Sequence, residues 1–518
     1  MKNKARALMI LGTASHVGKS ITVAALCRIF HQDGFNVAPF KAQNMALNSF
    51  ATTEGLEIGR AQAVQAQAAG LDPHVDMNPI LLKPSSDTGS QVVLNGKVFG
   101  SITAENFHSL RMELFREVQA AYNRLSARHN FIIIEGAGSP VEINLKHSDI
   151  VNLRMAEAAD ATCILVTDID RGGVFASLVG TYQLLTESER SRFGGFIINK
   201  FRGDIGLFQS GVTFLEERLN NPCFGVVPYF HNLKIDEEDS VALDKSSDPS
   251  AGRFSSSTAS ETDLRIGVVQ IPHMSNYTDF NVLEAVSGVS LFYLENPQYA
   301  ETADVLILPG SKNTIGDLNW LRATGWVNAL VRHAGANKPV IGICGGFQML
   351  GKSVRDPFHV ESNIESMSGL GLLDIVTSLG KEKVTRQASA TLVNAELFGI
   401  DQADSRPVFE GYEIHMGETV LGAGSHSFLS LRRLGDDSII SDGAVNDDGR
   451  IFGTYMHGLF DSPSGLNALL SHLRRLCGRV ESEQISSGVD RERHFDELAD
   501  HFRRHLDMDA IYKLVGIE

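Results

Sequence analysis

The chain has 518 residues, of which 43% are hydrophobic, and its formal net charge at pH 7 is -16. This length suits two or three domains, and the acidic charge disfavours binding to the phosphate backbone of a nucleic acid. No apolar stretch reaches the roughly 18–20 residues that a membrane-spanning helix needs, so we expect a cytoplasmic protein with no membrane partner. The five cysteines are scattered and include no Cys-x-x-Cys pair, which disfavours a disulfide framework and a zinc site.

Short apolar runs alternate with helical patterns along the chain. Runs this continuous are typical of strands covered on both faces, so they predict parallel sheets in an α/β fold. An Ala-rich stretch at 57–70 predicts one of the intervening helices. The clearest strand candidates are residues 7–12, 131–138, 161–168, 194–200, 264–272, 303–310 and 339–344.

One polar segment divides the chain into parts. Residues 237–263 are rich in Ser, Asp, Thr and Gly and have few large apolar side chains, so they cannot form a core. We therefore expect an N-terminal domain at 1–236, a linker or exposed loop at 237–263 and a second α/β domain at 264–465. The mixed polar pattern at 466–518 predicts a C-terminal helical extension.

The first strand candidate runs into the glycine-rich turn GTASHVGKS, which begins at Gly12 and contains Gly18, and a helical pattern follows it. A strand, a glycine turn and a helix N-terminus are the setting of a nucleotide phosphate loop, where backbone N–H groups bind anions. Lys19 would neutralise phosphate oxygens of ATP, and the Ser20 hydroxyl would bind Mg²⁺. Five residues rather than the usual four precede the Gly-Lys pair, and a chance Gly-Lys-Ser turn is the alternative.

Three polar residues follow other strand candidates and are expected at the same sheet edge. Glu135 is placed to bind Mg²⁺, although it could also be a capping or loop carboxylate. Asn199 could bind the adenine edge of a nucleotide or simply end its strand. Lys41 could hold an acidic substrate, with a solvated surface lysine as the alternative reading.

The run GICGG has the form of a nucleophile elbow, with Cys344 as the nucleophile and small neighbours that tolerate a strained turn. A buried structural cysteine is the alternative. A histidine should serve as its base, and His457 in IFGTYMHGLF is favoured over His415 in GYEIHMG. Backbone N–H groups of Gly345 and of the turn at Gly310 are candidates for an oxyanion hole.

These motifs together resemble those of the cobyric acid synthases, a family of glutamine-dependent enzymes of adenosylcobalamin synthesis that amidate four corrin side chains. The resemblance spans residues 12–460. It rests on the segments GTASHVGKS, PFKAQNMALNSF, EIGRAQAVQAQAAG, MNPILLKPSSDTGSQVVLNGK, EGAGSPVEINL, DIDRGGVFASL, INKFRGD, LPGSKNTIGDL, GICGGFQMLG, GYEIHMGET and YMHGLF.

The resemblance implies an N-terminal phosphate-loop domain similar to dethiobiotin synthetase, which shares the longer loop spacing, and a C-terminal class I glutamine amidotransferase domain. It implies ATP and Mg²⁺ as cofactors and glutamine and adenosylcobyrinic acid a,c-diamide as substrates. The amidated groups would be the b, d, e and g carboxylates. By the same match Glu135 would bind the metal, and Lys19 and Lys41 would contact phosphate and the substrate carboxylate.

The sequence departs from the amidotransferase pattern at one position and leaves two other functions open. Many class I domains have a Glu two residues after the catalytic His, where this chain has Leu459, so Glu413 or a backbone carbonyl is a guess for the group that orients His457. The alternatives are a cobyrinic acid a,c-diamide synthase and a non-enzymatic nucleotide switch with a decayed second domain. The segments KAQNMALNSF and MNPILLKP disfavour the first, and the intact cysteine turn disfavours the second.

Overall fold

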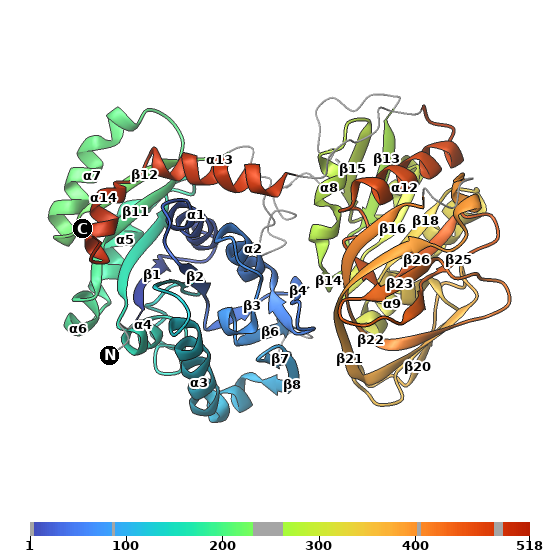
Figure 1. The fold of residues 1–518 in the computed structure, drawn as a ribbon, viewed down its shortest axis with the longest axis horizontal. Coiled ribbons are helices and arrows are strands. Elements are labelled where there is room, and N and C mark those ends of the chain that lie inside the picture. The colour runs from blue at the N-terminus through green and yellow to red at the C-terminus, as the bar shows by residue number, and fades with distance from the viewer. Residues whose placement is uncertain (1–4, 85–88, 231–262, 401–405, 481–489, 518) are drawn as a thin grey trace.

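The computed structural model describes residues 5–84, 89–230, 263–400, 406–480 and 490–517. They form two α/β halves, one N-terminal and one C-terminal (Figure 1). Almost all of the linker expected at 237–263 lies outside the described residues. None of the helices in the described ranges is both long enough and apolar enough to span a membrane.

The N-terminal half is organised around a six-stranded sheet in the order β12-β11-β10-β1-β9-β2, in which every neighbouring pair is parallel. This confirms the parallel sheet that the continuous apolar runs predict. In the β1–β9 register Ile10 lies opposite Glu135, so the loop after β1 and the end of β9 share the carboxyl edge of the sheet. The strands are β1 (Arg6–Gly12), β2 (Val37–Phe40), β9 (Phe131–Glu135), β10 (Thr162–Asp168), β11 (Phe193–Phe201) and β12 (Cys223–Pro228).

Helices cover both faces of this sheet because alternate strand residues point to opposite sides. Leu8 and Ile10 of β1 pack in one core, while Met9 and Leu11 pack in the other. The first core is closed by α1 (Lys19–Gln32), α13 (Arg491–Arg503) and α14 (Met508–Leu514). The second is closed by α3 (Ala104–Ser126), α4 (Leu153–Ala159), α5 (Val174–Gln183) and α7 (Ile205–Leu219), and α6 (Glu187–Arg190) is a short turn between α5 and β11.

The C-terminal helices are therefore divided between the two halves. Helix α12 (Pro463–Leu476) packs in the core of the C-terminal half, whereas α13 and α14 pack against the N-terminal half, beside α1 (Figure 1). The buried guanidinium of Arg28 in α1 pairs with Glu492 and Asp496 of α13, at 2.8 and 2.7 Å. The chain thus returns to its starting domain after completing the second one.

Between β2 and α3 the chain forms a small sheet and a hairpin. The small sheet is four-stranded, in the order β3-β6-β7-β8, and β4 pairs with β5 in the hairpin. The helix expected at 57–70 begins only at Arg60, as α2 (Arg60–Ala68), because residues 57–59 pair with β4 as a strand. The bounds are β3 (Gln43–Met45), β4 (Ser49–Ala51), β5 (Glu57–Gly59), β6 (Ile80–Pro84), β7 (Gly89–Leu94) and β8 (Lys97–Thr103).

The C-terminal half contains a second six-stranded sheet, in the order β15-β13-β16-β18-β26-β25, which is parallel except at β25. Its strands are β13 (Leu264–Val269), β15 (Val289–Leu294), β16 (Val305–Leu308), β18 (Val340–Ile343), β25 (Ala444–Val445) and β26 (Ile451–Thr454). Its helices are α8 (Asn281–Glu284), α9 (Thr314–Ala323), α10 (Trp326–Gly335) and α11 (Gly345–Leu350), with α12.

A mixed seven-stranded sheet lies beside it and was not anticipated from the sequence. In this sheet β22 pairs with β27 so that Tyr412 lies opposite His457. Its strands are β19 (Ser353–Arg355), β20 (Ser366–Ser368), β21 (Ile375–Leu392), β22 (Val408–Leu421), β23 (Leu429–Arg433), β24 (Ile439–Asp442) and β27 (Met456–His457). A two-stranded pair, β14 (Met274–Ser275) and β17 (Gly310–Ser311), completes the half.

Candidate active sites

Cys344 lies in a strained turn between β18 and α11. Its φ of 50° and ψ of -108° lie in a region that a residue with a Cβ rarely adopts, which is the backbone of a nucleophile elbow. The turn holds the sulfur at the carboxyl end of a central strand and at the start of a helix. The thiol also lies 3.6 Å from the carbonyl oxygen of Ile414 in β22.

The glycines around this turn allow close backbone approach. A Cβ added to Gly346 would lie 2.1 Å from the carbonyl oxygen of Leu308, and one added to Gly345 would lie 2.8 Å from the backbone nitrogen of Ser311. Larger residues would therefore push the elbow away from the β16–β17 loop. A Cβ on Gly310 would lie 3.3 Å from Cε1 of His457, so the two predicted oxyanion glycines and the predicted base occupy one small region.

His457 ends β27 with its imidazole buried and paired to Asp279. The Nδ1 of His457 lies 2.7 Å from Oδ2 of Asp279, and the neighbouring Gly458 N–H donates to Oδ1 at 3.1 Å. Asp279 comes from the 3₁₀ turn Tyr277–Phe280, in the loop region after β14, and is 178 residues away in the chain. The carboxylate therefore fixes both the ring and the backbone next to it.

The charge environment favours the imidazolium form. Burial alone would lower the pKa of His457, but the Asp279 carboxylate and then the Cys344 side chain outweigh it and raise that pKa to about 10. A hydrogen bond between Cys344 and the imidazole contributes to this shift. The arrangement is a Cys–His–Asp group in which the imidazole lies between the Asp279 carboxylate and the Cys344 side chain, as an activated nucleophile requires.

Glu413, suggested by the sequence as the group that orients His457, and His415, the rival base, have other partners. Glu413 pairs with Arg433 at 2.7 Å and with His415 at 3.3 Å, so the guess that it orients His457 is wrong. The residues next to Asp279 in the sequence form no motif that would mark this carboxylate as the partner of His457. His415 stacks on Tyr455, with ring centroids 3.8 Å apart.

In the N-terminal half, the loop after β1 wraps around the Lys19 ammonium. Lys19 Nζ donates to the carbonyl oxygens of Ala14, at 2.9 Å, and Gly138, at 3.1 Å. Gly18 has a φ of 101° and precedes the first residue of α1, and a Cβ there would lie 2.1 Å from Nδ2 of Asn199. A Cβ on Gly12 would lie 2.9 Å from Lys19 Nζ. The loop is thus a compact backbone cradle around one cation, at a helix N-terminus.

Asn199 braces this loop from the neighbouring strand β11. Its buried amide donates to the carbonyl oxygen of Val17 at 3.0 Å. Lys200, the next residue, donates to the carbonyl oxygen of His16 at 2.6 Å and to Asp168 at 3.0 Å. Both side chains therefore reach the predicted nucleotide loop.

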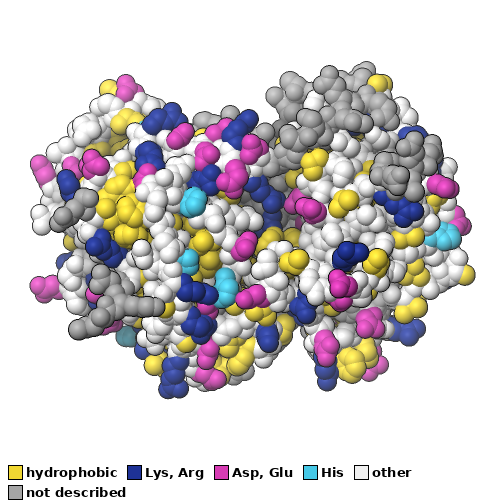
Figure 2. All heavy atoms as spheres, in the orientation of Figure 1, with side chains coloured by type: hydrophobic (Ala, Val, Ile, Leu, Met, Phe, Trp, Pro, Cys, Tyr) yellow, Lys and Arg dark blue, Asp and Glu magenta, His cyan; other side chains and the backbone are white. Residues whose placement is uncertain are grey.

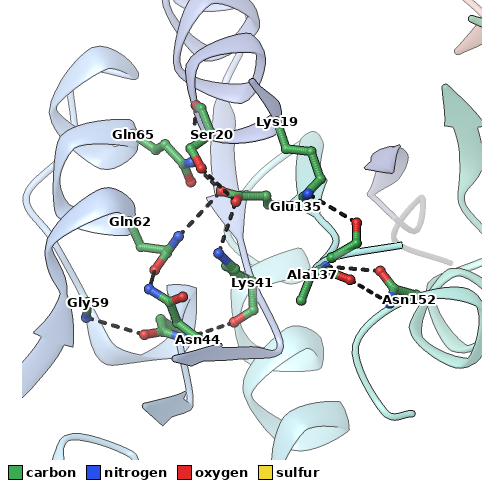
Figure 3. A network of polar contacts seen from close by, with 12 residues as sticks. Lys19, Ser20, Lys41, Asn44, Gly59, Gln62, Gln65, Glu135, Ala137 and Asn152 are labelled. Carbon is green, nitrogen blue, oxygen red and sulfur yellow. Dashed lines mark hydrogen bonds and ion pairs between the residues drawn. The ribbon is translucent and has the colours of Figure 1, made fainter. Parts of the chain in front are cut away.

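A buried carboxylate, Glu135, is the centre of the polar network in Figure 3. Its Oε1 accepts from Ser20 Oγ at 2.8 Å and from Lys41 Nζ at 2.9 Å. Its Oε2 accepts from Gln65 at 2.5 Å and from Gln62 at 3.4 Å. Since four side chains from α1, the β2–β3 loop and α2 converge on it, Glu135 organises this edge of the sheet.

The residues around Glu135 suit a Mg²⁺ ion that has only one or two protein ligands better than a metal ion whose ligands all come from the protein. No group of three or more His, Cys, Asp and Glu side chains that could hold a metal occurs in the part of the chain that the structure describes. Mg²⁺ usually needs only one or two protein oxygens, with phosphates and water as the other ligands. The Ser20 hydroxyl and the Glu135 carboxylate are adjacent hard oxygen donors of this kind.

Comparisons with known proteins agree with this division into two sites. Residues 8–241 match the CobQ/CobB/MinD/ParA nucleotide binding domain, and residues 265–465 match the CobB/CobQ-like glutamine amidotransferase domain. The chain is therefore a glutamine amidotransferase joined to a phosphate-loop nucleotide-binding domain.

Full-length relatives define the family. The chain is 47% identical over 522 residues to the cobyric acid synthase of Syntrophobacter fumaroxidans, with 100% of each chain covered. It is 46% identical to that of Clostridium acetobutylicum, covering 99% of each chain, and 47% identical to that of Citrobacter koseri, covering 98% of each chain. The chain belongs to the cobyric acid synthase family, and it is a glutamine-dependent ligase that uses a nucleotide.

Proposed function

We propose that this protein amidates the b, d, e and g carboxylates of adenosylcobyrinic acid a,c-diamide, with ATP and glutamine, to give adenosylcobyric acid. The single observation that carries the proposal is that one chain holds a complete Cys–His–Asp group and a complete phosphate loop. The first is suited to release nitrogen from glutamine, and the second is suited to activate a carboxylate. The full-length similarity to cobyric acid synthases supports the choice of substrate.

In the C-terminal half, the Cys344 thiolate attacks the side-chain amide carbon of glutamine. Backbone N–H groups of Gly345 and of the turn at Gly310 stabilise the oxyanion. His457 gives its proton to the departing ammonia, which leaves a thioester on the sulfur. His457 then takes a proton from water, whose oxygen attacks the thioester and releases glutamate, while Asp279 keeps the ring oriented.

In the N-terminal half, a substrate carboxylate attacks the γ-phosphorus of ATP and displaces ADP. The acyl phosphate that forms is a good electrophile, because the negative charge of the carboxylate is gone and phosphate is a good leaving group. Ammonia then displaces phosphate and leaves the amide. Lys19 and Asn199 hold the nucleotide and its loop, and Lys41 guides the acid. Mg²⁺, held by Ser20 and Glu135, would offset phosphate charge.

This scheme also sets the organisation that we propose for the chain. Residues 1–236 form the carboxylate-activating unit, 237–263 the connection, 264–465 the glutamine-hydrolysing unit and 466–518 the C-terminal extension. We place the enzyme in the cytoplasm, where ATP and glutamine are available, with no nucleic-acid or membrane partner. Ammonia would pass between the units before it is protonated.

Mass spectrometry of the corrinoid products tests the proposal. The purified enzyme is incubated with adenosylcobyrinic acid a,c-diamide, ATP, Mg²⁺ and glutamine, and each amidation replaces a hydroxyl by an amino group. A ladder of products that ends at the tetra-amidated corrinoid is expected. A parallel incubation contains the unamidated cobyrinic acid in place of the diamide. Amidation of that acid as far as the a,c-diamide, with no reaction of the diamide itself, would assign the protein to the diamide synthases and overturn the proposal.

A further inference from the structure

The two halves meet at the β4–β5 hairpin, residues 49–59, which projects from the N-terminal half. Its Ser49 N–H donates to Asn276 at 2.9 Å, and its Ala51 and Gly55 carbonyl oxygens each accept at 3.2 Å from the second half. The donors of those two bonds, Gln387 and Arg386, both lie on β21. The hairpin is therefore attached to the second half through its backbone at three separate points.

One face of this hairpin lies against the residues that hold the catalytic histidine. Ala51 packs with Tyr412 and Ile414 in one small apolar cluster, and the Phe50 ring lies 5.2 Å from the Tyr412 ring. The Tyr412 ring in turn stacks on the His457 imidazole, with centroids 5.4 Å apart and an interplanar angle of 19°. Tyr412 therefore links the hairpin to the imidazole beside the nucleophile.

A second contact of the hairpin reaches the acid of the same group. Asn276, which accepts from the hairpin backbone, immediately precedes the 3₁₀ turn that carries Asp279. Asn276 adopts the left-handed backbone conformation, with a φ of 53°, directly before that turn. A displacement of the hairpin would therefore be transmitted to both partners of the His457–Asp279 pair.

The other end of the hairpin leads into the phosphate-loop site. Residue 59 ends β5, and α2 begins at the next residue, so the hairpin and the helix form one continuous element. Gln62 and Gln65 of α2 are the amides that donate to Glu135. Arg60, at the start of the helix, lies over the Phe50 ring at 5.2 Å. The same element thus contacts the predicted metal carboxylate directly and reaches the predicted catalytic base through Tyr412.

A buried ion cluster fastens this element across the boundary. The Glu57 carboxylate accepts from Lys83 of its own half at 2.7 Å and from Lys383 of the other half at 2.5 Å. The three side chains are 1%, 4% and 11% exposed, so solvent screens them little. Burial alone would raise the pKa of Glu57, but Lys383 and Lys83 hold it well below its usual range. Dark-blue Lys and Arg side chains also lie where the two halves meet in Figure 2.

We propose that Glu57 and Lys383 are positioning residues that couple the two reactions, by making the β4–β5 hairpin and α2 move as one body between Glu135 and the His457–Asp279 pair. The inference rests on the proposed function, since it assumes that both sites react in sequence. Binding of nucleotide at Glu135 shifts the amides of α2, and the hairpin carries that shift to Tyr412 and Asn276. Glutamine hydrolysis then accelerates only when the acid-activating site is filled.

Rates of glutamine hydrolysis with and without ATP, Mg²⁺ and the corrinoid diamide test this coupling. Lys383→Met removes the positive charge that pairs with Glu57 across the boundary, and Lys383→Arg keeps a positive charge there. The control variant, Arg479→Met, breaks the Arg479–Asp304 ion pair, which lies within the second half. Allosteric couplings are typically about 5–150-fold. We expect Lys383→Met to reduce, by at least about fivefold, the factor by which ATP, Mg²⁺ and the corrinoid diamide accelerate glutamine hydrolysis. We expect Lys383→Arg and Arg479→Met to retain it.

Two controls separate coupling from general damage. Unstimulated glutamine hydrolysis and ammonium-driven amide synthesis should both stay close to wild type in Lys383→Met, because neither site loses a group that touches substrate. Parallel loss of both, or equal loss of activation in Arg479→Met, would mean that Lys383 only stabilises the fold, and the proposal would be overturned. Unchanged activation in Lys383→Met, or no activation in the wild type, would overturn it as well.

Hydrogen–deuterium exchange decides the question without any amidation. A non-hydrolysable ATP analogue with Mg²⁺ should change backbone exchange at 276–280 in the wild type and leave it unchanged in Lys383→Met. The same response in both proteins, or none in the wild type, refutes the coupling. If the wild type shows the response and hydrolyses glutamine but forms no corrinoid amide, the proposed function fails while the coupling stands.

Discussion

The Asp279→Asn substitution tests the most specific feature of the glutamine-hydrolysing site. Asp279 accepts from the His457 ring at 2.7 Å and from the Gly458 N–H at 3.1 Å. An asparagine has one oxygen for these two donors, so its amino group must face either the ring nitrogen or the backbone N–H. The variant therefore loses the negative charge and one hydrogen bond at a site without solvent to replace them.

The expected loss follows from the proton affinity of the ring. The pKa of His457 is raised from the ordinary 6.5 to about 10, which is on the order of 5 kcal/mol at about 1.36 kcal/mol per pKa unit. Asp279 shares this effect with Cys344, and both act against burial, which by itself would lower the pKa of the ring. A positioned acid–base group contributes about 10²–10⁴-fold, which is about 2.7–5.4 kcal/mol. We expect kcat/KM for glutamine hydrolysis to fall by a factor in this range.

Two measurements make the test specific. Glutamate release by Asp279→Asn is compared with that of Glu413→Gln, which removes another buried carboxylate near the site that is not a partner of His457. Ammonium-driven synthesis should be retained in both variants, because the N-terminal site is untouched. Glutamine hydrolysis by Asp279→Asn within about tenfold of wild type would refute the assignment of Asp279, since general acid–base contributions begin at about 10²-fold.

Further predictions concern the nucleophile, the phosphate loop, the elbow and pH. Cys344→Ala should abolish glutamine-dependent synthesis and keep ammonium-driven synthesis, whereas Lys19→Ala should abolish both; loss of the ammonium reaction in folded Cys344→Ala would contradict the division of labour. Gly346→Ala places a methyl group 2.1 Å from a backbone oxygen at the end of β16, so thermal unfolding should show a loss of about 1–3 kcal/mol, and an unchanged Tm would argue against this packing. Because the folded pKa of His457 is raised from 6.5 to about 10, its stabilisation is full below about pH 6.5 and is lost as pH rises toward 10. In denaturant unfolding, the difference in free energy of unfolding between wild type and Asp279→Asn should therefore become smaller as pH rises from about 6.5 to about 10. A difference that stays constant over this range would exclude the His457–Asp279 pair as its cause.

The parts of the fold that the sequence predicts are those formed by residues that are neighbours in the chain. The apolar runs at β1, β9 and β18 predict buried parallel strands, because a strand covered on both faces needs no polar side. The cysteine turn is equally local, since its small glycines are needed by the backbone of the turn itself. The helical pattern at 57–70 predicts a start three residues before that of α2, because pairing with β4 overrides the pattern at residues 57–59.

The parts that sequence could not predict depend on contacts between distant segments. Asp279 becomes the partner of His457 only because β14 and β27 are brought to one site by the fold. The family resemblance includes both ends of residues 49–59, but only the packed molecule shows that this stretch touches the second half. The return of α13 to α1 has the same origin, since a helix with one apolar face does not specify which core it covers.

By itself, then, the amino-acid order determined the two chemistries of this protein: a thiol turn and an anion-binding loop, each made by neighbouring residues and their backbone. Tertiary structure decided which carboxylate pairs with His457 and raises its pKa, which amides donate to Glu135, and where the two halves are in contact. The physical reason is that backbone geometry depends on adjacent residues, whereas electrostatic partners are chosen by distance in space.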